Sequence, residues 1–169
     1  MAVSGTHVRS SIHVTARSIV YLTNEISRVF LEAITGFGLD PGGYAESMPV
    51  IEKGLRTWAA LRQLEAAYLE VFDKQSGQVR ARIDLDVEFR DSGDDTRYET
   101  DIESVRRAVT QAGSYPGCAY RVVVTTKTGA AQVAGWSDTT LGSVDHLSRY
   151  DVGSVIDAPR TGANMGIYR

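Results

Sequence analysis

Residues 79–89 carry a strict alternation of apolar and polar side chains, and no other feature of the chain constrains the fold as strongly. Such an alternation places two sets of side chains on opposite faces of one extended strand. The apolar set is Val79, Ala81, Ile83, Leu85, Val87 and Phe89, and the polar set is Arg80, Arg82, Asp84, Asp86, Glu88 and Arg90. We therefore predict an antiparallel strand with one face in the core and a solvated, charged face opposite.

The residues before this strand complete a predicted hairpin from Ala67 to Phe89. Tyr68–Phe72 reads as its first strand and Lys74–Gly77 as its turn. Upstream, apolar residues at helical spacing predict two helices, over Thr15–Ile34 and Ser47–Leu64. The serine that opens the second helix is a predicted N-cap.

Downstream of the hairpin, Thr100–Glu103 has the form of a capping box and predicts a short third helix. A strand is expected over Cys118–Lys127, with Gln132–Trp136 returning as its partner. Ser137–Arg169 is rich in glycine, carries only short apolar pairs and predicts a segment with little regular structure. The expected fold is therefore α+β, with three helices packed on a mainly antiparallel sheet.

The composition indicates a globular protein, with 43% hydrophobic and 23% charged residues in a chain of 169. A net charge of −3 and scattered Lys and Arg residues argue against binding to nucleic acid. No apolar stretch is long enough for a membrane span, and no secretory signal is recognised, so we expect a cytoplasmic protein. The single cysteine, Cys118, excludes an internal disulfide and a thiolate metal cage, and we expect it to be a small buried residue.

One pair of residues suggests catalysis. Asp84 and Asp86 project from the same strand face, as carboxylates that hold Mg²⁺ in nucleotidyl-transfer sites do. A phosphate-binding loop that opens a helix and a third carboxylate are missing, so we interpret the pair as part of a solvated face. A small metal-dependent nucleotidyltransferase-like enzyme remains the alternative. His7, His13 and His146 share no ligand spacing. We expect no catalytic residue, metal or cofactor.

The order of these elements resembles the HORMA domain, and the chain looks most similar to bacterial HORMA proteins of anti-phage (CBASS-type) signalling operons. The segments that carry the resemblance are the strands Tyr68–Phe72 and Val79–Phe89, the helix after Thr100, and the runs Tyr120–Thr125 and Val133–Thr139. The link from Ile34 to Ser47 is too short for the extra hairpin of eukaryotic members, which fits a bacterial one.

The resemblance implies a peptide-binding switch rather than an enzyme. A closure-motif peptide would add as a strand to the sheet edge, and a C-terminal safety belt would wrap over it. The closed form would activate a cGAS-like nucleotidyltransferase, and an AAA+ ATPase would reopen it through the N-terminus. The implied peptide-binding residues are Tyr120, Arg121, Val122, Val123, Val124, Thr125 and Trp136.

The same resemblance divides one domain, residues 1–169, into three parts. Residues 1–11 would be a flexible arm that the ATPase engages, residues 12–136 the core, and residues 137–169 the belt. A further alternative is a structural subunit that self-associates through the open sheet edge.

Overall fold

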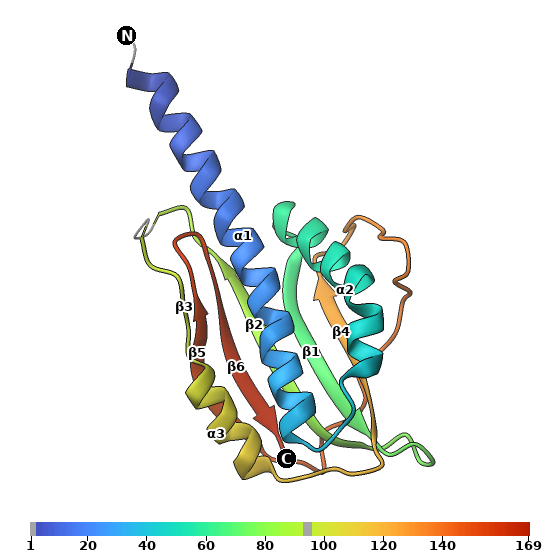
Figure 1. The fold of residues 1–169 in the computed structure, drawn as a ribbon. Helices are drawn as coiled ribbons and strands as arrows, with labels where there is room; N and C mark the ends of the chain where they lie inside the picture. Colours follow the sequence, from blue (N-terminus) through green and yellow to red (C-terminus); the bar gives the residue numbers. More distant parts are fainter. Residues whose placement is uncertain (1–2, 93–95) are drawn as a thin grey trace.

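The computed structural model of the protein describes residues 3–92 and 96–169, with side chains from His13 onward in the first helix. The described residues form three helices on one face of a six-stranded sheet (Figure 1). The helices are α1 (Val3–Gly36), α2 (Gly42–Ala60) and α3 (Ile102–Ala112). The strands are β1 (Leu64–Phe72), β2 (Val79–Phe89), β3 (Glu99–Thr100), β4 (Ala119–Thr126), β5 (Arg149–Asp157) and β6 (Thr161–Tyr168). This architecture confirms the predicted fold class.

The strand order is β3-β5-β6-β2-β1-β4, and every neighbouring pair is antiparallel. The central hairpin β1–β2 has β4 on one side and the C-terminal hairpin β5–β6 on the other. The chain therefore leaves β4 at one edge of the sheet and re-enters beyond β2. This crossing from one side to the other shapes the candidate site described below.

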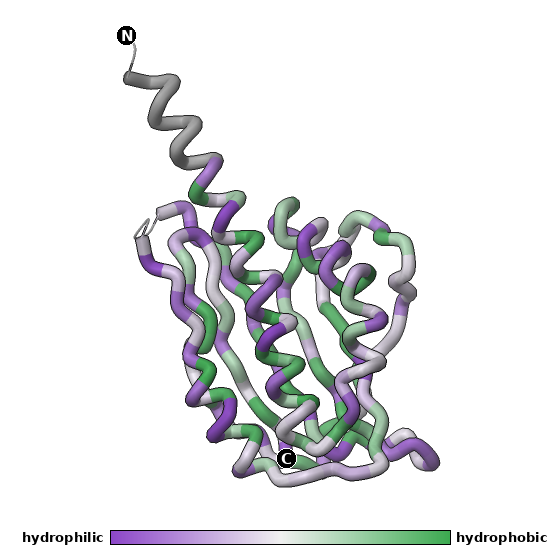
Figure 2. The backbone as a smooth tube through the Cα atoms, viewed as in Figure 1, coloured by the Kyte–Doolittle hydropathy of each residue, from purple (hydrophilic) through white to green (hydrophobic). Residues whose placement is uncertain are grey.

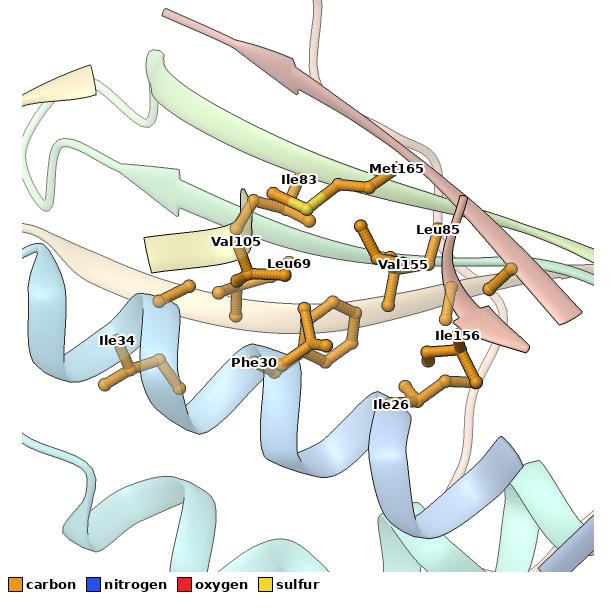
Figure 3. Close-up of a cluster of buried hydrophobic side chains, with 14 of the residues drawn as sticks. Ile26, Phe30, Ile34, Leu69, Ile83, Leu85, Val105, Val155, Ile156 and Met165 are labelled. Carbon is orange, nitrogen blue, oxygen red and sulfur yellow. The ribbon is translucent and has the colours of Figure 1, made fainter. Parts of the chain in front are cut away.

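The core lies between α1 and the central strands. Ile26, Phe30 and Ile34 of α1 point at the sheet, where they meet Leu69 and Ile83 (Figure 3). All five side chains are fully buried. Figure 2 shows hydrophobic and hydrophilic residues interleaved along the helices and strands around this core. The apolar side of β2 faces α1, as its alternation predicts, because burying each large apolar side chain stabilises the fold by about 1.5–3 kcal/mol.

The helices differ from their predicted bounds. α1 begins at Val3 rather than Thr15, so residues 3–11 of the expected arm lie in its first turns, and Met1 and Ala2 lie outside the described residues. The predicted N-cap Ser47 is wrong, because α2 already begins at Gly42. The Asp40 carboxylate accepts the Gly42 N–H at 2.9 Å and so satisfies one free donor of the earlier start.

Three further boundaries differ. α2 ends at Ala60 rather than at the predicted Leu64. β1 begins at Leu64, four residues before the predicted strand. The N-cap of α3 is Asp101 rather than Thr100, and its carboxylate accepts the Ser104 N–H at 3.0 Å. No helix among residues 3–92 and 96–169 is both long and apolar enough to cross a membrane.

The C-terminal part of the chain, residues 132–169, contradicts the sequence-based prediction. Gln132–Trp136 forms no strand, and Ser137–Arg169 contains both β5 and β6. β6 is hard to recognise because glycine and asparagine occupy its outer face, while Ala163, Met165 and Ile167 fill the core. The end of the chain is thus an integral part of the sheet.

Candidate functional site

The outer edge of β4 carries unpaired main-chain groups. Main-chain groups point alternately to the two sides of a strand, and Lys127 donates its N–H to Gln63 O beside β1. It follows that Tyr120, Val122 and Val124 direct their N–H and C=O groups away from β1. Among the described residues, no main-chain hydrogen bond joins β4 to residues 128–148. This edge is a template on which a further strand can pair.

The chain between β4 and β5, residues 127–148, is called the crossing segment here. It leaves the top of β4, runs outside the open edge and returns behind the sheet, on the face opposite the helices (Figure 1). Its first part contacts α2 on the helical side, and its last part contacts the opposite, outer face of the sheet. The crossing segment therefore passes around the edge of β4.

Two tryptophans fix the first part of the crossing segment to α2. Trp58 of α2 donates its Nε1–H to Ala131 O at 2.7 Å, and Trp136 of the segment donates its Nε1–H to Val50 O of α2 at 2.9 Å. The two rings meet edge to face with centroids 5.1 Å apart. A Cβ at Gly54 would lie 2.3 Å from Trp136 Nε1, so the contact needs glycine there. We call this arrangement the tryptophan clasp.

A buried carboxylate fixes the last part of the crossing segment to the outer face. The Glu70 side chain is 1% exposed and accepts hydrogen bonds from Arg121 Nε at 2.7 Å and from Gly142 N–H at 2.8 Å. Arg121 also donates to the Thr140 carbonyl at 2.7 Å. Beyond it, His146 Nε2 donates to Val79 O at 2.7 Å. Charge-assisted hydrogen bonds of this kind are among the strong ones in proteins.

Between these two attachments, cavities flank the open edge. One, of about 760 Å³, lies between β4 and residues 126–139. A second of similar volume lies between the first half of β4 and the start of α2. Val122 and Trp136 line both cavities. The crossing segment therefore passes around the edge without filling the space beside it.

Tyrosines support the helical wall of this space. Tyr120 donates its hydroxyl to Asp40 O at 2.6 Å and accepts the Tyr44 N–H at 3.1 Å, which ties β4 to the first turn of α2. Tyr44 donates its own hydroxyl to Ser27 Oγ at 2.8 Å. Burial raises the pKa of Tyr44 to about 12, so this hydroxyl stays protonated at any physiological pH.

The structure brings the residues expected to bind peptide to one place. Tyr120, Val122 and Val124 pack toward the helices and offer the open main chain, while Trp136 closes the space from outside. The neighbouring residues Arg121, Val123 and Thr125 alternate with them and pair with β1. The peptide-binding role of all seven residues stays a prediction.

Sequence reasoning missed Glu70, Trp58 and Gly54. Glu70 stands in a run that alternates poorly, and nothing local shows that its carboxylate is buried. Trp58 belongs to the apolar pattern of the predicted second helix, which indicates an inward-facing side chain and nothing about a partner. Their roles depend on contacts with residues more than fifty positions away, which no local pattern reports.

The strand face that carries Asp84 and Asp86 is not uniformly solvated, which corrects the prediction. Arg82 is 7% exposed and Asp84 is 4% exposed, because Tyr68 and Tyr168 lie against the Arg82 guanidinium. Asp84 accepts hydrogen bonds from Arg82 Nε at 2.7 Å and from Arg149 Nη1 at 3.2 Å. Its oxygens are thus engaged by guanidinium groups, an arrangement that disfavours a metal site.

The remaining candidate residues are dispersed. His13 is exposed on α1, His146 lies on the outer face as described, and the side chain of His7 lies outside the described residues. Cys118 lies just before β4 and is half-buried rather than buried as expected. Among the described residues, no group of three or more His, Cys, Asp or Glu side chains is placed to hold a metal ion.

Comparison with solved structures identifies the architecture as that of HORMA domains. A chain of the mitotic checkpoint complex superposes with a TM-score of 0.66 at 13% identity, covering 86% of this chain and 97% of that one. C. elegans HTP-2 bound to the HIM-3 closure motif gives 0.60 at 13% identity over 83% and 84% of the two chains. C. elegans HTP-1 bound to the same motif gives 0.52 at 13% identity, over 70% of this chain and 67% of that one.

The family follows from the sequence itself. Residues 6–169 match the model of the family described as Bacterial HORMA domain 2. The match extends over nearly the whole chain, so the chain belongs to this bacterial HORMA family. No curated protein sequence matches it.

Proposed function

We propose that this protein is a peptide-binding conformational switch without chemistry of its own. A closure-motif peptide would pair with the open edge of β4, inside the crossing segment. The observation that carries the proposal is the enclosure of this unpaired edge, with the crossing segment fixed to α2 on one face and to Glu70 on the other. The solved relatives bound to closure motifs support it.

Strand addition alone would bind a peptide only weakly, and a segment that passes around the peptide compensates for this. A peptide that adds about four to six main-chain hydrogen bonds gains only a few kcal/mol, since each contributes about 0.5–1.5 kcal/mol net. The loss of translational and rotational freedom consumes much of that gain. Strand addition alone would therefore bind near the millimolar level, about −4 kcal/mol. A segment that passes around the bound peptide slows its release without needing stronger pairing.

We assign the observed strand order to the belted state of this proposed switch. We propose that the belt comprises the crossing segment together with β5–β6, and so begins about ten residues before the expected residue 137. The belt and the sheet together form a closed ring of chain around the β4 edge. This ring stays closed while β6 pairs with β2 over Arg82–Phe89. Opening would require the C-terminal hairpin to leave β2.

Amide hydrogen exchange tests the peptide site. A peptide selected from a random library should slow exchange at Tyr120, Val122 and Val124 at least about tenfold, because their N–H groups would gain partners. Arg121, Val123 and Thr125 already pair with β1 and should change little. This alternation of protected and unchanged amides is the expected result.

Two other outcomes would contradict the peptide site. Protection confined to the outer face of β2, or an even change along β4, would indicate binding elsewhere or general stabilisation. Protection of the same alternate amides that depends on protein concentration without peptide would favour self-association through this edge.

We further propose the partners. In the cytoplasm, the belted complex would bind and activate a cGAS-like nucleotidyltransferase in anti-phage defence, and an AAA+ ATPase would reopen it. Membership of a bacterial HORMA family and the resemblance to members of such operons support these roles. α1 projects past the sheet at its N-terminal end, where an ATPase could engage residues 1–11 (Figure 1).

Reconstitution would test these partners. With peptide, the protein should raise nucleotidyltransferase activity, and the ATPase with ATP should reverse that increase. Deleting residues 1–11 should preserve peptide binding and activation but abolish the reversal, measured as product formed over time. Reversal that persists in the deleted protein would contradict the role of the N-terminus, and a silent nucleotidyltransferase would contradict the partnership.

A further inference from the structure

The C-terminal hairpin carries two glycines on the outer face of β6, in register with acidic residues on both neighbouring strands. Gly166 lies opposite Asp84 of β2 and opposite Asp151 of β5. In the same way, Gly162 lies opposite Glu88 and Asp157. Each row across the three strands therefore reads acid, glycine, acid.

An arginine lies across each glycine. Arg149 starts on β5, passes over Gly166 and donates from Nη1 to Asp84 Oδ2 on β2 at 3.2 Å. Its Nε also hydrogen bonds to Asp151 at 3.2 Å. One guanidinium thus joins the two outer strands of the row across the middle one.

The second row runs in the opposite direction. Arg90 follows the end of β2, passes over Gly162 and donates from Nη1 to Asp157 Oδ1 of β5 at 2.6 Å. It also forms an ion pair with Glu88 of β2. The two crossings therefore connect β2 to β5 at both ends of β6.

The glycines leave the space that the arginines occupy. A Cβ at Gly166 would lie 2.5 Å from Nη2 and 2.6 Å from Cζ of Arg149. A Cβ at Gly162 would lie 2.5 Å from Nη2 of Arg90. Any larger residue would displace the guanidinium groups from their course over the strand. Glycine is otherwise unfavourable inside a strand, which makes these two positions informative.

The row at Gly166 is also sheltered. The Tyr168 ring lies between two cations, with its centroid 4.7 Å from Arg82 Cζ and 5.7 Å from Arg149 Cζ. Cation–π contacts of this kind strengthen as water is removed from them. Asp84 is almost fully buried, so the ion pair with Arg149 is screened less by salt than an exposed pair would be.

From this geometry we propose that Arg149 and Arg90 are positioning residues that fasten the C-terminal hairpin to β2. They form an ionic fastener whose strength sets how often the hairpin leaves the sheet. The inference deepens the proposed function, because it rests on this hairpin closing the ring around a bound peptide. Its structural part, the fastening itself, can be measured without any peptide.

The test uses Gly166→Ala in the full chain, because this change keeps every charge and displaces only the Arg149 guanidinium. Amide exchange across β2–β6, relative to β1–β2, reports hairpin opening separately from global unfolding. At low salt we expect β2–β6 exchange to rise about 3- to 10-fold, the loss of a partly exposed charge-assisted pair. In 1 M NaCl the difference from the unchanged protein should shrink, since salt weakens the pair that only the unchanged protein retains, though by less than it would weaken a fully exposed pair.

Asn164→Ala is the matched control, because Asn164 lies on the same face of β6, between the two glycines, and is exposed. It should leave exchange unchanged at both salt concentrations. Arg149→Gln should reproduce the effect of Gly166→Ala, and it decides the question if the alanine variant does not fold. Unchanged β2–β6 exchange in Arg149→Gln, or a rise independent of salt, would overturn the fastener. A failure to bind peptide would instead bear on the proposed function alone.

Discussion

Replacing Trp136 with alanine is expected to detach the first part of the crossing segment from α2 while the domain stays folded. The change removes the hydrogen bond to Val50 O and the edge-to-face contact with Trp58. Truncating a tryptophan in a core costs about 3–5 kcal/mol, and we expect about 2–3 kcal/mol here because Trp136 is only partly buried. A bound peptide should then dissociate about 30- to 150-fold faster, measured by fluorescence after dilution.

Graded variants separate the parts of the tryptophan clasp. Trp136→Phe keeps an aromatic ring against Trp58 but loses the indole donor. The peptide should therefore dissociate from it faster than from the unchanged protein and more slowly than from Trp136→Ala. Leu61→Ala removes a side chain that is 55% exposed at the end of α2, and it should have no effect. Equal dissociation from Trp136→Ala and the unchanged protein would show that the crossing segment does not retain the peptide.

A proline at position 122 is expected to weaken strand addition strongly while sparing the sheet. The Val122 N–H points away from β1, so proline removes a donor that only an added strand would use, and edge strands tolerate proline there. The proline ring would also occupy the space of the incoming main chain. We expect peptide affinity to fall roughly 10- to 100-fold or more, since an unsatisfied peptide carbonyl costs about 1–3 kcal/mol. Calorimetric titration measures this directly.

Val122→Ala is the matched control, because it loses the same apolar side chain and keeps the N–H. Both variants should lose similar stability in urea denaturation, but only the proline should lose binding. Placing proline at Val123 instead would remove a bond to β1, and we expect that variant to be strongly destabilised. Equal peptide affinity in Val122→Pro and Val122→Ala would exclude main-chain pairing at this edge.

The hairpin β1–β2 illustrates what local patterns determine. The alternation over Val79–Phe89 predicted the bounds of β2 correctly, because its apolar face is stable only when it is buried in the core. The bounds of the edge strand β4 were also predicted to within one residue at either end, since a run of three valines strongly favours a strand. The local residue pattern alone determines these two strands, and so the core and the candidate edge were both predictable.

Other parts of the fold depend on partners that are distant in the sequence. β6 reads as irregular because two of its outer-face positions are glycines, and their purpose is visible only once Arg149 and Arg90 lie across them. The start of α2 is supported by the Tyr120 hydroxyl, which comes from β4. Gln132–Trp136 looked like a strand, but its indole donor holds it against a helix. Long-range contacts of this sort override local propensity.

The path of the crossing segment makes the shape of the ligand matter as well as its affinity. A short peptide with a free end could slide lengthwise between β4 and residues 127–148 without disturbing the sheet. A segment tethered at both ends within a large protein has no end to thread and could enter only after β6 separates from β2. We therefore expect the two kinds of ligand to bind the same site with very different association rates. The association rate of the tethered kind should be limited by how often the arginine fastener breaks and β6 separates from β2.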